Sequence, residues 1–168
     1  DERWVDIQDE ASNAGMVNRT LFSNSPGSNA RFYPVPTLQH SNPQKSADAY
    51  SGLIENICKG KPPQFDLILL GLGDDGHTAS LFPFSQTLNS KDCWVTVANA
   101  KGHDRITLTA PVLSAAQKIV FLVSGRSKQQ ALRRLIDPLE STDRTPARLV
   151  KPNSEILIYA DEAATSFV

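Results

Sequence analysis

The sequence has few cysteines, little net charge and no long apolar run, and each of these features excludes a class of protein. Its two cysteines, Cys58 and Cys93, match no metal or redox spacing and are typical of buried thiols in a reducing compartment. A net charge of −1 gives no overall attraction to nucleic acid or an anionic membrane. The longest apolar run is too short to span a membrane, and no signal-peptide pattern opens the chain. We therefore expect a cytoplasmic, monomeric enzyme or binding protein with no nucleic-acid or membrane partner.

The sequence does contain an alternation of apolar strands and amphipathic helices. Its 168 residues, 40% of them hydrophobic, suffice for one domain with a sizeable core. "DLILLG" (66–71) and "KIVFLVSG" (118–125) are continuous apolar runs, typical of parallel strands buried on both faces. Further strands are predicted at 93–99, 105–109 and 154–161, and helices at 12–22, 44–60, 110–117 and 126–137. This alternation predicts an α/β fold with a mainly parallel sheet covered on both faces.

The stretch "DLILLGLGDDGHTASLFP" has the G-x-G-x-x-G spacing of a dinucleotide-binding loop, at Gly71, Gly73 and Gly76. The neighbouring residues argue against such a loop. Asp74 and Asp75 would repel a diphosphate. A helix expected to begin near His77 meets Pro83 after about two turns, which is short for this role. The next strand ends in Asn99, where a dinucleotide site needs an acidic residue.

Asp75 and His77 make this loop a candidate catalytic site. In open α/β sheets, ligands bind outside the carboxyl ends of the strands, and the loop follows such an end. A carboxylate and an imidazole two residues apart are suited to acid–base chemistry there. A glycine turn without catalytic function is the plainer alternative.

Four segments resemble one known family. "GLGDDGHTASLFP" is similar to the signature of the 6-phosphogluconolactonases, and "DERWV" with "SNAGM", "RITLTAPVLSAAQKIVFLVSG" and "SGRSKQQAL" follow the family order. The resemblance runs from residue 1 to about residue 160. It implies a three-layer α/β/α fold like that of glucosamine-6-phosphate deaminase and ribose-5-phosphate isomerase. It also implies hydrolysis of 6-phospho-D-glucono-1,5-lactone to 6-phospho-D-gluconate in the pentose phosphate pathway, without a cofactor.

The resemblance also implies roles for individual residues. His77 matches the catalytic histidine and Asp75 the aspartate of the same motif, so His77 is expected to be the general base and Asp75 to orient its ring. The positions expected to meet the substrate and its phosphate are Arg3, Arg105 and Lys128. Amides near Gly73 and Gly76, or a nearby cation, are candidate donors to the oxyanion.

Other chemistries find less support in the sequence. Ser80 is not surrounded by a G-x-S-x-G elbow, which argues against a serine hydrolase. His40 and His103 lack ligand spacing, so no metal site is assigned. The deaminase motif has a Glu five residues after its histidine, where this sequence has Phe82, and an apolar ring cannot carry a proton. A deaminase-like isomerase and a non-catalytic sugar-phosphate sensor remain the alternatives.

One expectation concerns the extent of the domain. The family places a Gly/Ser-rich phosphate loop after its first strand, before the "DERWV" segment, and no such stretch occurs here. Residues 1–168 are therefore expected to form a single lactonase domain that lacks an N-terminal strand–helix segment and this phosphate loop. An uncovered edge or face beside residues 1–5 is expected to accompany that lack.

Overall fold

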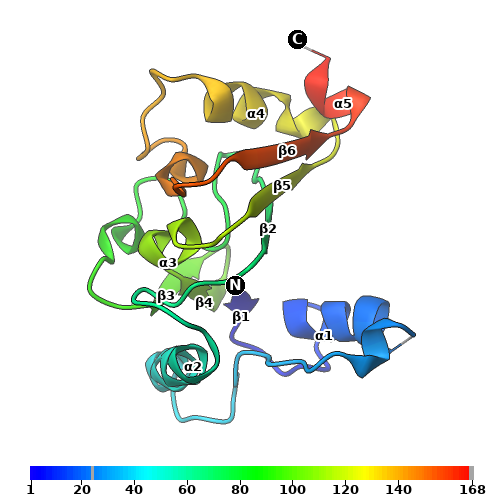
Figure 1. Cartoon of the computed structure of the whole chain (residues 1–168), viewed down its shortest axis with the longest axis vertical. Coiled ribbons are helices and arrows are strands. Elements are labelled where there is room, and N and C mark those ends of the chain that lie inside the picture. Colours follow the sequence, from blue (N-terminus) through cyan, green and yellow to red (C-terminus); the bar gives the residue numbers. More distant parts are fainter. Residues whose placement is uncertain (24, 167–168) are drawn as a thin grey trace.

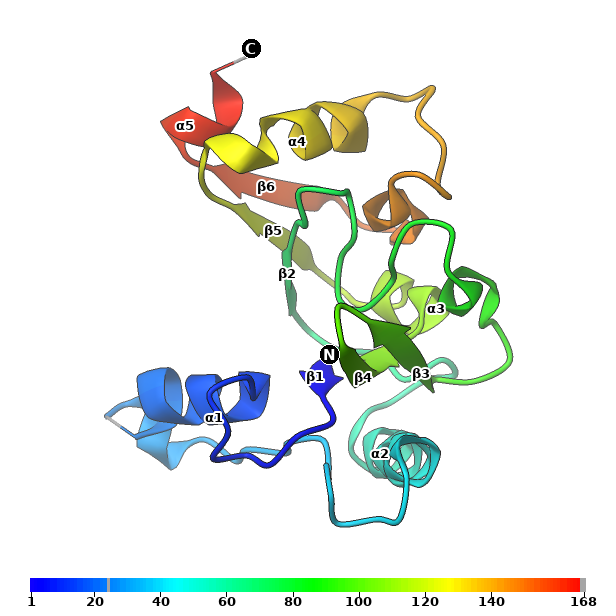
Figure 2. The ribbon, with the colours of Figure 1, turned by 180° about the vertical axis from the view of Figure 1, so that it is seen from behind.

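The computed structural model describes residues 1–23 and 25–166, and its strands form two three-stranded sheets. One sheet has the order β1-β4-β3 and the other the order β2-β5-β6. Figures 1 and 2 show α4 and α5 beside the second sheet at one end of the molecule, and α1 and α2 at the other end. The strands are β1 (Glu2–Arg3), β2 (Ile68–Gly71), β3 (Val95–Ala100), β4 (His103–Leu108), β5 (Ile119–Val123) and β6 (Ile156–Ala160). The α-helices are α1 (Asn13–Val17), α2 (Pro43–Ile57), α3 (Ala110–Ser114), α4 (Gln129–Ile136) and α5 (Glu162–Thr165).

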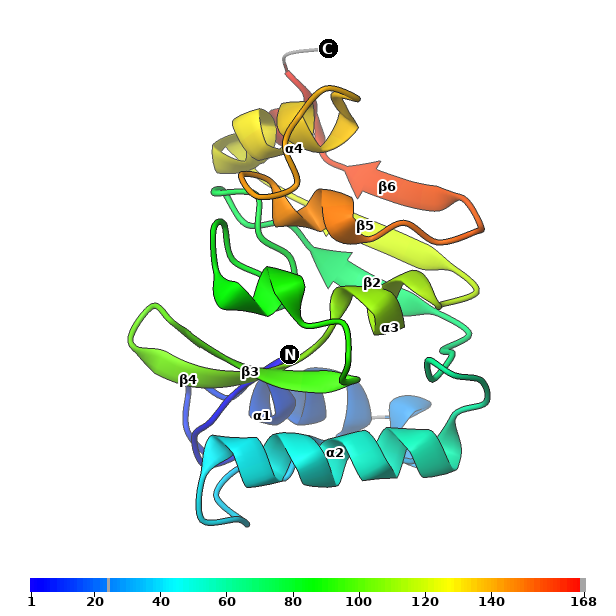
Figure 3. The same ribbon diagram turned by 90° about the vertical axis from the view of Figure 1, so that its left-hand side faces the viewer.

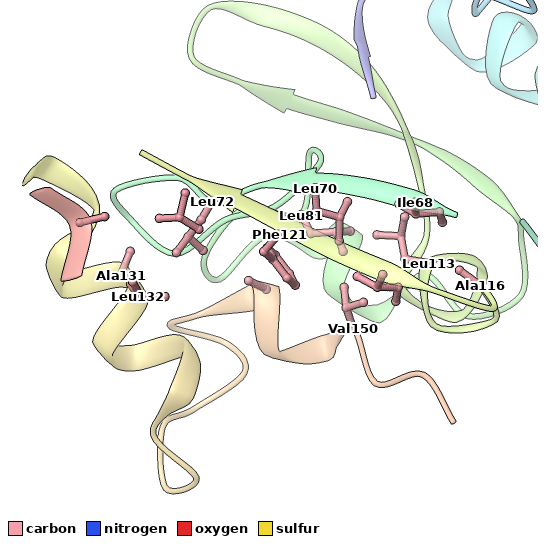
Figure 4. Close-up of a cluster of buried hydrophobic side chains, with 14 of the residues drawn as sticks. Ile68, Leu70, Leu72, Leu81, Leu113, Ala116, Phe121, Ala131, Leu132 and Val150 are labelled. Atoms are coloured by element: carbon pink, nitrogen blue, oxygen red, sulfur yellow. The ribbon is translucent and has the colours of Figure 1, made fainter. Parts of the chain in front are cut away.

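The parallel sheet β2-β5-β6 carries the larger hydrophobic core on one of its faces. β5 is the central strand, and its Phe121 stands opposite Leu70 of β2 in the register. Phe121 is fully buried, which stabilises the fold by about 2–3 kcal/mol relative to an exposed ring. Figure 4 shows the apolar side chains that fill this core, among them Leu113 of α3, Leu132 of α4 and Val150.

The antiparallel sheet β1-β4-β3 packs against α2, which runs along it in Figure 3. Ala47 and Ile54 of α2 are completely buried against Val95 and Ile106 of the sheet. The helix begins one residue before the predicted start and ends at Ile57, three residues before the predicted end. The side chain of Asn42 accepts a hydrogen bond from the Lys45 amide and caps the first turn of the helix.

The α/β prediction is confirmed in its elements, but only half of the strand pairing is parallel. The predicted strands at 93–99 and 105–109 form an antiparallel hairpin, β3–β4, with Ala100 opposite His103. Only Lys101 and Gly102 separate those two residues, and so short a connection forces the chain to reverse direction. β1 adds to the outer side of β4, also antiparallel.

The prediction that the sheet is covered on both faces holds for only one face of the parallel sheet. On the side of the parallel sheet opposite the core, large apolar side chains are exposed, namely Leu67, Leu69, Leu122 and Tyr159. The alternation of buried and exposed residues along β2 follows from the two-residue period of a strand. β1 is an edge strand, and in the described residues it pairs only with β4.

The prediction that a helix begins near His77 is wrong. Residues 72–84 form turns, with a short antiparallel bridge between Thr78 and Leu81. Gly76, Ala79 and Phe84 have φ values of +94°, +49° and +58°, which a right-handed helix excludes. No helix in residues 1–23 and 25–166 is long and apolar enough to cross a membrane.

Candidate active site

The loop that follows β2 folds back on itself around Gly73. The Gly73 amide donates to the His77 carbonyl at 2.8 Å, and the Gly76 amide donates to the Gly73 carbonyl at 3.0 Å. The Thr78 hydroxyl donates to the carbonyl of Gly71, the last residue of β2, at 2.8 Å. These bonds turn the His77 side chain back over the end of the strand. The amides of Gly73 and Gly76 are used inside the turn, so neither is available to an oxyanion.

Hydrogen bonds with residues far away in the sequence hold this loop in place. The Ala147 amide donates to the Gly76 carbonyl at 3.1 Å, and an Arg134 nitrogen donates to the Asp74 carbonyl at 3.3 Å. The Ser80 amide donates to the Thr107 hydroxyl at 3.1 Å. A Cβ on Gly76 would lie 3.1 Å from Thr145, so Gly76 serves the close packing of this support.

Asp75 and His77 form a tight pair within the loop. Asp75 Oδ1 lies 2.5 Å from His77 Nδ1 and also accepts the His77 amide at 3.0 Å. The imidazole side chain is 20% exposed and the carboxylate 36%. Nδ1 therefore carries the proton that Asp75 accepts, which leaves Nε2 as a lone-pair acceptor.

The surroundings set the proton affinities of both groups. Burial lowers the pKa of His77, and the Asp75 carboxylate opposes that shift without cancelling it. Burial acts to raise the pKa of Asp75, but hydrogen bonds from the His77 amide and ring outweigh it and lower the pKa. At neutral pH the pair is thus a carboxylate beside a neutral imidazole, the state that a general base requires.

His77 lines a pocket of about 260 Å³ at the carboxyl end of the parallel sheet. Four other residues that the sequence analysis assigned to the site line the same pocket: Gly73, Arg3, Arg105 and Lys128. Asp75 and Gly76 are not among its lining residues. Asp75 is connected to the pocket by its hydrogen bond with the His77 ring, whereas Gly76 packs against Thr145.

The three cations of the pocket differ in what already binds them. Arg3 donates to the Ala11 carbonyl at 2.5 Å and to the Asn13 side chain at 3.3 Å. Arg105 is buried, 3.5 Å from the Asp1 carboxylate. Lys128 follows β5, and its side chain makes no ion pair or hydrogen bond with the residues that the structure describes. Its ammonium group is the cation most available to an anionic ligand.

Residues to which the sequence analysis gave no role in the site lie in the pocket or beside it. Asp1 accepts a hydrogen bond from the buried Ser80 hydroxyl at 2.6 Å, so that hydroxyl is engaged in a structural contact. The ring of Phe82 lies against His77, with 4.5 Å between centroids and 33° between planes. Lys101 Nζ lies 3.6 Å from Asp75 Oδ2. Lys101 comes from the β3–β4 hairpin, and only the antiparallel pairing of the strands, which the sequence analysis did not predict, brings it here.

No group of three or more potential metal ligands was found among residues 1–23 and 25–166. The cationic side chains that line the pocket are those of Arg3, Arg105 and Lys128. Such charge, beside a neutral histidine, suits an anionic substrate whose reaction needs a base.

Comparison with known proteins identifies the family. The family model described as glucosamine-6-phosphate isomerases/6-phosphogluconolactonase matches residues 1–159. The chain belongs to this family. It is 38% identical to a 6-phosphogluconolactonase from Synechocystis over 167 residues, which cover 98% of this chain and 69% of that protein.

Solved structures of similar proteins agree with the fold. The crystal structure of devB protein matches with a TM-score of 0.85 and 34% identity, covering 99% of this chain and 71% of the other. A monomeric glucosamine-6-phosphate deaminase matches with a TM-score of 0.75 and 18% identity, covering 99% and 72%. At that identity the deaminase supports the fold alone, and the residues around His77 must separate the two activities.

Proposed function

We propose that this chain hydrolyses 6-phospho-D-glucono-1,5-lactone to 6-phospho-D-gluconate in the pentose phosphate pathway, with His77 as the general base. The membership of the family and the identity to named 6-phosphogluconolactonases support the reaction. The observation that carries the role of His77 is its pairing with Asp75 on the wall of a cation-lined pocket.

The chemistry needs little more than this pair. A δ-lactone is an activated ester, so an oriented water and a base near neutral pH suffice. Nε2 of His77 takes a proton from the water as its oxygen attacks the lactone carbonyl carbon, and Asp75 stabilises the imidazolium that forms. When the tetrahedral intermediate collapses, the bond from the carbonyl carbon to the ring oxygen breaks. The imidazolium returns its proton to that leaving oxygen, which becomes the hydroxyl of the product. General-base help of this kind is worth about 10²–10⁴-fold.

The cations divide the anionic groups of the substrate between them. The Lys128 ammonium has no ion pair with the residues that the structure describes, and Arg3 lines the same pocket, so these two side chains bind the phosphate dianion. Arg105 lies 5.4 Å from the ring of Phe82, which in turn lies against His77. This position suits Arg105 to stabilise the oxyanion, because the amides of Gly73 and Gly76 are engaged within the loop.

Phe82 disfavours the deaminase alternative. It occupies the place where the deaminase motif has its proton-carrying Glu, and the structure buries its ring against His77. An aromatic ring can hold the imidazole in place but cannot relay a proton. A non-catalytic sensor is disfavoured as well, because phosphate binding alone would not require the Asp75–His77 pair.

The test is the rate of 6-phosphogluconate formation above the spontaneous hydrolysis of the lactone. We expect His77→Asn to lower kcat by about 10²–10⁴-fold with a much smaller change in KM, because the base acts in the transition state. His40→Asn, a change of the same kind at an exposed histidine, should leave both constants unchanged. If His77→Asn keeps the turnover of the unmodified chain, His77 is not the base.

A further inference from the structure

The tip of the β3–β4 hairpin places a lysine beside the catalytic pair. Lys101 Nζ lies 3.6 Å from Asp75 Oδ2, the carboxylate oxygen that does not bind the His77 ring. The same ammonium lies 5.5 Å from the centroid of the Phe82 ring. Lys101 is absent from the residues that line the pocket, so its connection to the site runs through Asp75 and Phe82.

We propose that Lys101 is a positioning residue for lactone hydrolysis, which holds the second oxygen of Asp75 so that the first oxygen stays on His77 Nδ1. This inference rests on the proposed role of His77 as the base. Lys101 acts through Asp75 and does not touch the substrate.

The backbone of the hairpin supplies an independent reason to assign a function to Lys101. Lys101 has φ +54° and Gly102 φ +81°, so both residues of the two-residue turn are in the left-handed region. Turns of this kind favour Asn–Gly or Asp–Gly, and lysine is poorly suited to the first position. A side chain that the turn itself disfavours, with its charge directed at Asp75, indicates a role outside the turn.

The ring of Phe82 lies close to the Lys101 ammonium and to the imidazole of His77. Its buried ring contacts His77, and both Lys101 and Arg105 approach the ring within 5.5 Å of its centroid. The negative face of an aromatic ring attracts cations without accepting a proton from them. Phe82 therefore keeps two positive charges close to the imidazole while it shields His77 from hydrogen bonding with them.

The electrostatic consequence is that Lys101 helps to keep His77 neutral. Burial is the main cause that lowers the pKa of His77, Asp75 opposes it, and the charges of Lys101 and Arg105 add to the lowering. The charged groups that face His77 come from its own loop, the hairpin, the start of the chain and the turn before α4: Asp75, Lys101, Arg105, Asp1, Arg3 and Lys128. Without Lys101, the balance around the imidazole shifts toward Asp75, and His77 binds a proton more readily.

Lys101→Asn is the deciding variant, because Asn suits the turn better than Lys and removes only the charge. NMR titration of the His77 ring, assigned with His77→Asn, reports on this charge without needing activity. The pKa of His77 should rise by a few tenths of a unit to about one unit in Lys101→Asn. It should return toward the original value in Lys101→Arg and stay unchanged in Lys91→Asn, at an exposed loop lysine. An unchanged His77 pKa in Lys101→Asn overturns the proposal.

Kinetics separate positioning from substrate binding. Lys101→Asn should lower kcat about three- to tenfold, as expected for one partly exposed ion pair, and move the acid limb of kcat/KM to higher pH. KM should change less than twofold. A rise in KM confined to the phosphorylated lactone, with the pH profile unmoved, would make Lys101 a phosphate ligand and overturn the proposal. If the unmodified chain does not exceed spontaneous hydrolysis, the proposed function fails, and the His77 titration still decides whether Lys101 acts on the pair.

Discussion

Replacing Gly73 by alanine should disable the catalytic pair without unfolding the chain. A Cβ built on Gly73 would lie 2.0 Å from His77 Nδ1, 2.3 Å from its Cε1 and 2.6 Å from Asp75 Oδ1. Non-bonded carbon contacts begin near 3.4 Å, so the imidazole must move by roughly 1.4 Å to admit the methyl group. The φ of Gly73 lies outside the left-handed region, so alanine fits its backbone and the clash falls on the side chains of the pair.

The size of the kinetic effect follows from that displacement. A misplacement of about 1 Å in a catalytic group costs on the order of 10²-fold in rate, or about 2.7 kcal/mol in the barrier. We therefore expect Gly73→Ala to lower kcat about 100-fold. KM should change much less, because the cations that we propose to bind the phosphate come from other segments of the chain.

The assay is lactone hydrolysis above the spontaneous rate, with circular dichroism to confirm that the variant is folded. Gly52→Ala is the matched control, since a Cβ at this position of α2 meets no atom within 4 Å. That control should retain full kcat and gain about 0.5–1 kcal/mol of stability from better helix propensity. A folded Gly73→Ala variant with a kcat within twofold of the original would show that the observed position of His77 is not the one from which it acts.

Three further predictions concern the pH profile, the phosphate and the sheet. Burial lowers the pKa of His77 from its usual 6.5, so the imidazole stays neutral as the pH falls toward that value. We therefore expect kcat/KM to decline only below about pH 6.5, and a decline that begins above pH 7 would contradict this. Lys128→Ala should weaken binding of the phosphorylated lactone by about 1.5–3 kcal/mol and leave unphosphorylated gluconolactone unaffected, whereas equal losses on both would exclude a phosphate contact. In urea unfolding, Leu70→Ala should lower the free energy of unfolding by about 2–5 kcal/mol and Leu69→Ala by less than about 1 kcal/mol, because the two side chains are 6% and 59% exposed. Equal losses would mean that the face with Leu69 is covered.

The sequence is informative about the elements of the fold because its apolar runs are strong and its turns short. Each predicted strand has a counterpart, and α2 begins at Pro43, next to the predicted position. The direction of pairing was harder to predict. Periodicity identifies a strand at 105–109 but does not say which neighbour it pairs with, so it predicts a mainly parallel sheet and misses the antiparallel β3–β4 hairpin. Backbone angles explain the absent helix after His77, because Ala79 and Phe84 adopt left-handed conformations that their side chains do not favour.

The candidate site was predictable as far as the motifs reach. Arg3, His77, Arg105 and Lys128 belong to separate segments of the chain, and the structure brings all four to one pocket. Lys101 belongs to no quoted motif, and its contact with Asp75 depends on the hairpin geometry. The roles assigned to these residues, and the expected absence of an N-terminal segment, stay predictions.

The hydrogen bonds that support the loop around His77 have a consequence for when this loop takes up its structure. The loop is fixed by Ala147 on one side and by Thr107 on another, and Ser80 bonds to Asp1, 79 positions earlier. Contacts between residues so far apart in sequence form late, since loop-closure entropy must be overcome before they stabilise anything. A chain leaving the ribosome can form the turn around Gly73 early, but β2 waits for β5, and the loop lacks the hydrogen bond from the Ala147 amide until that residue has emerged. The loop around His77 therefore takes up its observed structure only after the residues up to Ala147 have been made.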